Sequence, residues 1–333
     1  MAGWNLKAGT ITKYDVSEDE MWSLFNYVFS ESSMKKTSYK FGLIKSILDN
    51  MLNGEETPMG VFFPYEKIFY KFTENYWNLV VKYNLRQMIY GTNAELSKIE
   101  IILRDFVETD NILGFIDFDS IEETKKKSIV KKVTYECKKN VIGALYNDFE
   151  GKVYSFDLKV DGITISYTAF HFMLKYKTAL EKLNYYAWAR FLEKTNSDNV
   201  LVRVVDKLEL ATPRRENLSV YRNILRKEFE YNNCFYCGKK LENNVHVDHF
   251  IPWSFIKDDK IWNFVLACPS CNEKKNNRLP GIPYLEKIIE RNNIIKNSST
   301  DIIQTEFSNY SDDLIIRMCN YAKLSGMKEF LFL

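Results

Sequence analysis

Four of the six cysteines in the chain form two pairs, and two residues separate the partners of each pair. Cys234 and Cys237 make the first pair, which Gly238 follows, and Cys268 and Cys271 make the second. Two such pairs can supply four thiolates to one tetrahedral zinc ion, and the glycine permits the tight turn that this geometry needs. A zinc with four protein ligands has no open position, so we expect a structural zinc that stabilises a short segment.

A second set of chemically capable side chains lies between the two cysteine pairs. Apolar and polar residues alternate from Val245 onward, which predicts a strand that ends at Asp248 and His249. After the second cysteine pair, residues 272–278 are rich in basic and amide side chains and predict the start of a polar helix. A strand end that faces a helix start would form a compact cleft.

These residues carry a resemblance to a known family. Asp248 and His249, then Asn263, then Asn272 resemble the Asp-His, Asn, Asn signature of the HNH nucleases, and the cysteine pairs resemble the frame that commonly encloses it. The segment Val247–Leu266 is especially similar to the HNH domain of CRISPR single-effector nucleases. The resemblance implies a zinc-stapled ββα-metal fold for this segment, whereas the preceding region resembles no family that we recognise.

The resemblance also implies hydrolysis of DNA phosphodiester bonds. His249 would act as the general base that takes a proton from water. Asp248 and Asn272 would supply oxygen ligands to one Mg²⁺ or Mn²⁺, which would bind the scissile phosphate, ease departure of the 3′ oxygen and leave 5′-phosphate ends. Asn263 would hold the loop or orient His249 through a backbone contact and would not touch the metal.

Four further side chains are candidate contacts to nucleic acid. His246 would share a strand face with Asp248, from where it could touch phosphate or metal, although a merely exposed strand residue is the more common case. Lys274, Lys275 and Arg278 would lie where the helix meets the DNA backbone.

The composition places these motifs in a well-folded protein. The chain has 333 residues, of which 46% are hydrophobic, with 13 glycines and 7 prolines, so we expect no long disordered segment. The formal net charge is only +2, so a nucleic-acid surface must come from local clustering of charge. No apolar run approaches the ~18 residues of a membrane span, and the start has no signal-peptide pattern. We therefore expect a cytoplasmic protein without membrane contact.

The length exceeds that of a usual single domain, and residues 211–217 resemble a linker. We expect a mainly α fold in two parts. Residues 1–210 would form a large helical region that selects the substrate or binds a partner, and residues 211–333 would form the HNH nuclease domain with C-terminal helices. Within the first part, the turn signal at residues 160–162 predicts a small two-stranded β-hairpin, and the aromatic residues 61–72 predict core packing.

One predicted helix carries a basic stripe. Lys125, Lys132 and Lys139 repeat every seven residues on a different face from the apolar residues of the segment 121–145. Such a stripe can contact phosphates, and it is also common on an ordinary solvated helix. Further helices are predicted over residues 18–52, 64–90, 171–193, 200–210, 282–293 and 312–325.

Our first hypothesis is a metal-dependent DNA endonuclease from a restriction or phage-defence setting, with double-stranded DNA as its partner. A zinc-dependent DNA-binding module that has lost cleavage is a second hypothesis, against which the intact Asp248, His249 and Asn272 argue. A third is a structure-specific or RNA-directed nuclease or a toxin. A single HNH centre cuts one strand at a time, so double-strand breaks would favour a homodimer or sequential nicking. The sequence also leaves open whether the chain has a partner protein from a defence system.

Overall fold

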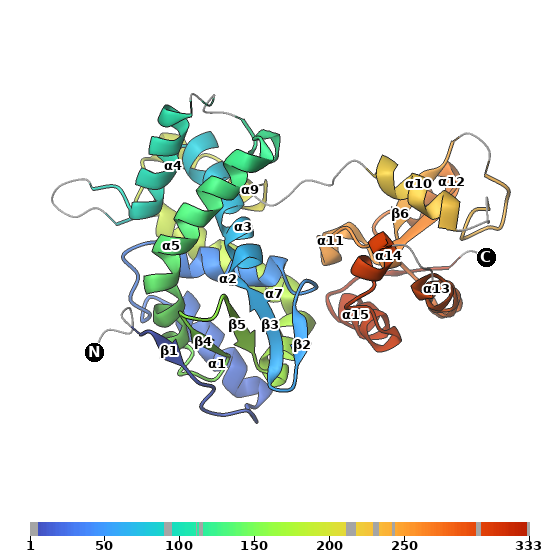
Figure 1. The fold of residues 1–333 in the computed structure, drawn as a ribbon, viewed down its shortest axis with the longest axis horizontal. Helices are drawn as coiled ribbons and strands as arrows, with labels where there is room; N and C mark the ends of the chain where they lie inside the picture. Colours follow the sequence, from blue (N-terminus) through green and yellow to red (C-terminus); the bar gives the residue numbers. More distant parts are fainter. Residues whose placement is uncertain are drawn as a thin grey trace. The chain divides into compact units, whose positions relative to one another are not determined.

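The computed structural model describes residues 6–89, 95–110, 112, 116–210, 218–228, 233–241, 244–297 and 301–331. The chain divides into two compact units, Met1–Pro213 and Arg214–Leu333 (Figure 1). Helices make up most of the described chain and the sheets are small, which confirms the mainly helical fold class. The linker expected over residues 211–217 lies outside the described residues.

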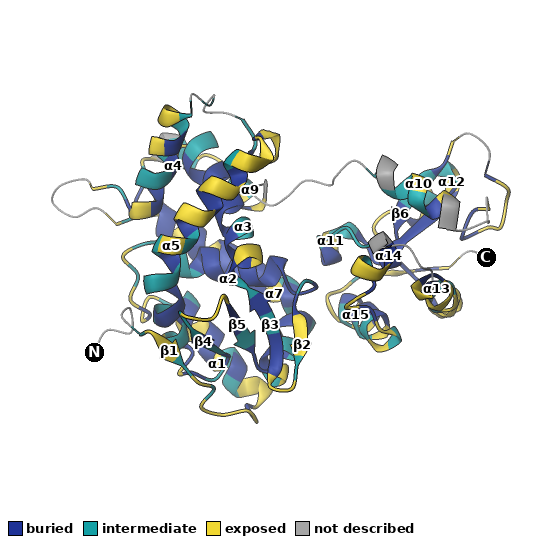
Figure 2. Cartoon of the chain, viewed as in Figure 1, coloured by how far each residue is buried: buried dark blue, intermediate teal, exposed yellow. Residues whose placement is uncertain are grey.

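Helices of the first unit meet in an aromatic core. Phe72 stacks on Tyr76 with ring centroids 4.4 Å apart, and Tyr76 also contacts Trp188 at 5.6 Å. All three side chains are fully or almost fully buried, which confirms the expected core packing of the aromatic run. Helix α2 (Tyr39–Asp49), which packs in the same core, is coloured as buried along most of its length in Figure 2. The helices are α1 (Glu18–Phe29), α2 (Tyr39–Asp49), α3 (Tyr65–Tyr76), α4 (Lys98–Thr109), α5 (Glu123–Asp148), α6 (Tyr167–Lys175), α7 (Lys177–Glu193), α8 (Asp198–Leu201) and α9 (Val204–Leu210), with a π-helical turn at Trp77–Lys82 and a 3-10 turn at Phe118–Ser120.

The predicted hairpin belongs to a larger sheet. Its strands pair as expected across the turn, but the sheet has five antiparallel strands in the order β1-β4-β5-β3-β2. The pairing of Val61 with Ile165 joins the hairpin to a strand about a hundred positions earlier in the chain. The predicted hairpin is therefore present, as two strands of a larger sheet that the sequence did not predict. The strands are β1 (Ala8–Gly9), β2 (Glu55–Thr57), β3 (Gly60–Pro64), β4 (Tyr154–Asp157) and β5 (Gly162–Ile165).

Two predicted helices of the first unit are interrupted. The helix expected from His171 to Glu193 is split into α6 and α7 at Tyr176. The helix expected over residues 200–210 breaks at Arg203, whose φ of +56° lies in the left-handed region and ends α8 before α9 begins. Apolar spacing alone does not reveal such single-residue breaks.

The second unit places a two-stranded antiparallel sheet between helices. Strand β6 (His246–His249) pairs with β7 (Phe264–Ala267), and helix α12 (Pro269–Lys275) follows directly, so the order is strand, strand, helix. The helices expected over 282–293 and 312–325 are present, whereas α14 was missed. The remaining elements are α10 (Ser219–Glu228), α11 (Trp253–Ile256), a 3-10 turn at Ile261–Asn263, α13 (Ile282–Lys296), α14 (Asp301–Glu306), α15 (Asp312–Leu324) and the parallel pair β8 (Leu279–Pro280) and β9 (Glu329–Phe330).

Two cysteines outside the paired motifs are part of the packed interior. Cys137 and Cys319 are 1% and 2% exposed, so both are buried thiols. Every helix within the described residues is too short or too polar to cross a membrane.

Candidate functional site

The four paired cysteines converge at one point of the second unit. The Sγ atoms of Cys234, Cys237, Cys268 and Cys271 all lie within 4.8 Å of one another, and those of Cys237 and Cys268 are 4.0 Å apart. Sulfur atoms bound to one tetrahedral zinc at about 2.3 Å would be about 3.8 Å apart. The cluster can therefore hold zinc with only a small contraction.

The first cysteine pair is closed by a tight turn at Gly238. Its N–H donates to the carbonyl of Cys234 at 2.9 Å, and its φ is +73°. A side chain at this position would meet no atom within 4 Å, so glycine is favoured by its backbone conformation and not by lack of space. The N–H of Cys268 donates to Sγ of Cys234 at 3.4 Å, which joins the two pairs. Burial raises the pKa of the Cys234 thiol, a change that a bound cation would oppose.

Strand β6 carries Asp248 into a buried polar contact. The carboxylate is 8% exposed and accepts a hydrogen bond from the Tyr236 hydroxyl at 2.5 Å. The Lys275 ammonium lies 3.1 Å from its Oδ1 and 3.0 Å from its Oδ2. Burial, together with the nearby charge of Asp248, raises the pKa of Tyr236 well above its ordinary value, so this hydroxyl remains a donor.

His249 at the end of β6 is paired with a carboxylate that the sequence reasoning missed. Its Nε2 lies 2.7 Å from Oδ1 of Asp259, and the two side chains are 6% and 8% exposed. An ionised carboxylate only accepts hydrogen bonds, so Nε2 is the donor in this contact, and in the neutral imidazole Nδ1 is then the nitrogen that can accept a proton. The rings of Trp253 and Phe264 pack against the imidazole at 5.3 Å and 4.7 Å and fix its plane.

Asn263 fixes the turn that follows His249. Its backbone carbonyl accepts from the N–H of Phe250 at 2.7 Å. Its side-chain amide makes two bonds to the backbone of Ile251, one accepted by Oδ1 at 2.8 Å and one donated by Nδ2 at 3.0 Å. The side chain is completely buried, and these bonds turn it toward the loop backbone.

Asn272 approaches the same strand from helix α12. The helix begins at Pro269, earlier than the sequence suggested, so Asn272 lies in its interior and not at its start. The amide Nδ2 lies 3.0 Å from Nδ1 of His246. Among the described residues, none makes a hydrogen bond to Oδ1 of Asn272, which leaves this oxygen available to a ligand.

A cleft of about 370 Å³ brings these side chains together. Asp248, His249, Asn272 and Lys275 all line it. The carboxylate of Asp248 and the amide oxygen of Asn272 are the hard oxygen donors that Mg²⁺ and Mn²⁺ prefer. The residues present therefore fit a hard divalent cation.

The three basic residues expected to meet DNA differ from one another. Lys274 is exposed. Lys275 is 1% exposed and, besides the Asp248 contact, donates to the backbone carbonyl of His249 at 2.7 Å. Arg278 folds back, with Nε 3.3 Å from the carbonyl of Lys275 and its guanidinium 4.7 Å from the ring of Phe330. In this conformation Lys275 faces the cleft interior, not a surface open to phosphate.

Comparison with known proteins identifies this segment. The family model of the HNH endonucleases matches residues 234–281. These residues form an HNH domain. The match includes both cysteine pairs and all of Asp248, His249, Asn263 and Asn272. No curated protein and no solved structure matched the chain significantly. The chain thus carries a nuclease domain of the HNH type, which implies a nucleic-acid substrate.

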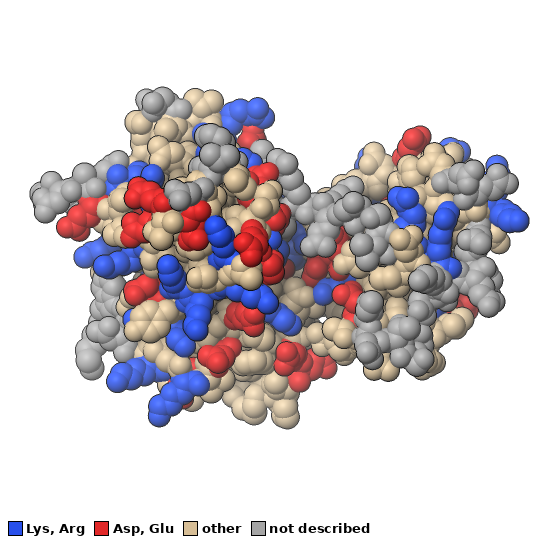
Figure 3. All heavy atoms as spheres, turned by 45° about the horizontal axis from the view of Figure 1, so that its top comes forward, with Lys and Arg blue, Asp and Glu red and all other residues tan. Residues whose placement is uncertain are grey.

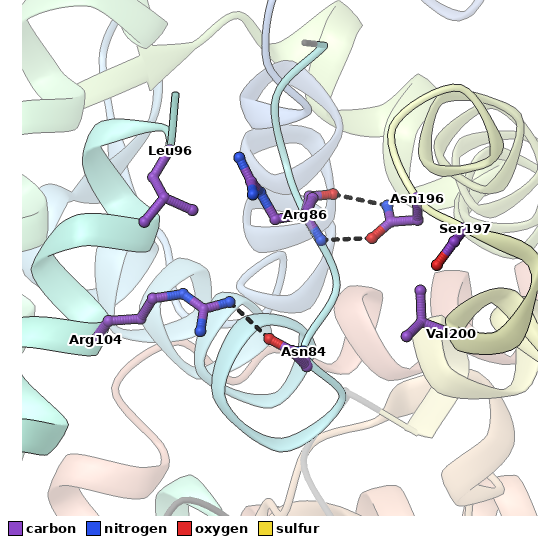
Figure 4. Close-up of a pocket in the computed structure, with 7 residues that line it drawn as sticks. All are labelled: Asn84, Arg86, Leu96, Arg104, Asn196, Ser197 and Val200. Atoms are coloured by element: carbon purple, nitrogen blue, oxygen red, sulfur yellow. Dashed lines mark hydrogen bonds between the residues drawn. The ribbon is translucent and has the colours of Figure 1, made fainter. Parts of the chain in front are cut away.

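The first unit contains a separate cavity of about 560 Å³ (Figure 4). The side-chain amide of Asn196 makes two bonds to the backbone of Arg86, accepting from its N–H at 2.7 Å and donating to its carbonyl at 3.0 Å. Arg104 donates to the side chain of Asn84 at 2.8 Å, and Arg86 pairs with the buried Glu100 at 3.1 Å. These polar groups bind one another across segments of the fold, and the sequence assigned none of them to a site.

Proposed function

We propose that the HNH domain is a metal-dependent endonuclease that hydrolyses DNA phosphodiester bonds. The observation that carries the proposal is the pairing of His249 with Asp259, because His249 lines the same cleft as Asp248 and Asn272. A histidine with one nitrogen fixed by a buried carboxylate and the other unprotonated is arranged for general base catalysis. A zinc-binding module without activity would have no need of this pair.

Asp248 and Asn272 would hold one Mg²⁺ or Mn²⁺ through the carboxylate and the amide oxygen. When bound, this ion supplies positive charge to the scissile phosphate and to the departing 3′ oxygen. The Lys275 ammonium offsets part of the Asp248 charge, and its bond to the His249 carbonyl fixes the strand end. The contact of His246 with Asn272 orients the amide so that its oxygen remains available.

His249 accepts a proton from the attacking water at Nδ1. The water oxygen then bonds to phosphorus while the bond from phosphorus to the 3′ oxygen breaks, and the leaving oxygen takes a proton from solvent. The positive charge that forms on the imidazole is stabilised by Asp259, 2.7 Å from Nε2. Asn263 keeps the following loop in place, so the base remains fixed. Products carry 5′-phosphate and 3′-hydroxyl ends.

A zinc ion held by the four cysteines would be structural, because four thiolates leave it no open position. The biological setting in restriction or phage defence stays a prediction from the resemblance, as do a homodimer, a partner protein and the assignment of residues 1–210 to substrate selection.

End-labelled DNA tests the proposed chemistry. The purified chain is incubated with single-stranded and duplex DNA in Mg²⁺, in Mn²⁺ and in EDTA, with the zinc content measured in parallel. We expect cleavage only with added divalent ion, and product mobility that matches 5′-phosphate standards. Cleavage in EDTA, or products with 5′-hydroxyl ends, would contradict this mechanism. Cleavage of RNA in preference to DNA would leave the mechanism intact and change the substrate.

A further inference from the structure

Helix α5 (Glu123–Asp148) is the most lysine-rich element of the first unit. Its 26 residues include seven lysines against three acidic residues. Basic and acidic side chains are interspersed in the view of Figure 3, so a basic face has to be located residue by residue. The helix is long enough for one face to be apolar and the opposite face to be uniformly basic.

The apolar face of α5 is buried in the unit. Ile129, Val133 and Leu145 are fully buried, and Lys126 on the same side is 8% exposed and pairs with Glu123 at 3.5 Å. The helix packs against α1, α2, α3 and α4. These contacts fix which side of the helix faces solvent.

The solvent face of α5 is formed by lysines around one tyrosine. Lys127, Lys131 and Lys132 are exposed, and among the residues that the structure describes, none forms an ion pair with them. Tyr135 is 60% exposed and lies four positions after Lys131 and three after Lys132, so the three side chains are neighbours on the helix surface. The Lys139 ammonium lies over the Tyr135 ring at 3.4 Å from its centroid.

Acidic residues border this face without neutralising its centre. Lys125 is 3.4 Å from Asp110, and Lys139 is 3.8 Å from Glu136. The third pair at this border, Lys138 with Asp161, spans 3.9 Å. Of the expected stripe, Lys125 and Lys139 therefore have an acidic partner each, whereas Lys132 has none among the described residues.

We infer that this face of α5, which comprises Lys127, Lys131, Lys132, Tyr135 and Lys139, binds the phosphate backbone of the duplex DNA on which the HNH domain acts. The inference rests on the proposed function for the choice of DNA as the partner. From Lys127 to Lys139 the helix rises about 18 Å, which spans several phosphates of one duplex strand. Ammonium groups at this spacing match phosphate charge without reading bases, so binding is independent of sequence. The exposed Tyr135 ring adds an apolar surface for a sugar.

Binding is tested in the full chain with His249→Ala, which prevents cleavage. A labelled duplex is titrated by fluorescence anisotropy from 50 to 300 mM KCl for this parent and for Lys127→Gln/Lys131→Gln/Lys132→Gln. We expect at least tenfold weaker binding at 100 mM KCl and a log–log salt slope smaller in magnitude by about 2 to 3, since each phosphate that a lysine neutralises contributes about 0.9 to this slope. Two duplexes of unrelated sequence should respond alike.

A matched triple variant controls for charge. Lys7→Gln/Lys159→Gln/Lys182→Gln removes three exposed lysines of the same unit outside α5 and should bind within about twofold of the parent. Circular dichroism melting shows whether both triples remain folded. Equal binding by the two triples, or no duplex binding by the parent at 50 mM KCl, would overturn the inference. The inference would also be overturned if the α5 triple variant lost binding to anionic lipid vesicles while its DNA binding stayed unchanged. Failure of the proposed function is seen separately, as absence of cleavage by the wild-type chain.

Discussion

The Asp259→Asn substitution tests whether Asp259 positions His249 for catalysis, because it should change the histidine contact without disturbing the fold. The change preserves shape and removes one charge from a contact of 2.7 Å between two buried side chains. The asparagine amide can donate to Nε2, which would move the imidazole proton to Nδ1 and block the nitrogen that accepts the proton of water. The general base would then be in the wrong tautomer.

The size of the effect follows from the kind of hydrogen bond that the substitution removes. A hydrogen bond to a charged group contributes about 1.5 to 3 kcal/mol. If this stabilisation is needed only once the imidazole becomes charged, its removal lowers the rate by about 10- to 150-fold. We therefore expect cleavage of bound DNA to slow by that factor, with DNA affinity and zinc content unchanged.

Single-turnover cleavage at saturating protein measures this rate directly. Asp258→Asn is the matched control, because this neighbouring carboxylate lies 3.6 Å from the Lys260 ammonium and outside the His249 contact. The control should cleave at the wild-type rate. A fall of less than threefold for Asp259→Asn, or an equal fall for Asp258→Asn, would refute the assignment of Asp259 as the positioning residue.

Three other substitutions test the framework of the site and the stability of the fold. Asn263→Ala removes two buried hydrogen bonds to Ile251 and should lower the free energy of unfolding by about 2 to 4 kcal/mol in denaturant titrations; a change below 1 kcal/mol would show that the loop does not depend on it. Cys271→Ser should abolish stoichiometric zinc by metal analysis, whereas Cys319→Ser, which changes a buried thiol outside the cluster, should retain it; zinc retained in both would contradict the four-cysteine site. Burial raises the pKa of Glu74 to about 7. The folded state therefore binds this proton more tightly than the unfolded state, and stability falls as pH rises from about 4.5 to 7. The Glu74→Gln variant should lack this fall in the free energy of unfolding, which amounts to roughly 2 to 3 kcal/mol. If denaturant titrations gave the variant the same pH dependence as wild type, Glu74 would not be the source of the fall.

The local chemistry of the site was predictable from the sequence because metal ligands and short strands follow from spacing. Both cysteine pairs and the strand that ends at His249 are where the pattern placed them. Asp259 was missed because a single acidic residue in a polar loop has no pattern that separates it from a solvated one. Only the folded loop brings it to His249.

Helix register explains the different position of Lys275. The helix starts at Pro269, so Asn272 and Lys275, three positions apart, share the face that packs against β6. Lys274 points elsewhere and is exposed. A sequence-based prediction that starts the helix a few residues too late cannot tell the buried lysine from the exposed one.

The five-stranded sheet was missed for a different reason. Strand β3 is short and lies within an aromatic run whose spacing also suits a helix. It pairs with β5, far away in the sequence, and such pairing depends on tertiary contacts that local propensity does not encode.

Nicking of supercoiled plasmid in Mn²⁺ tests whether His249 is the general base of a DNA-cutting site. Wild-type protein, His249→Ala and His171→Ala are compared at equal zinc content, the last variant serving as a histidine substitution in the other unit. We expect nicking by wild type and His171→Ala and a loss of at least a hundredfold for His249→Ala. Nicking by His249→Ala at the wild-type rate would contradict this role of His249.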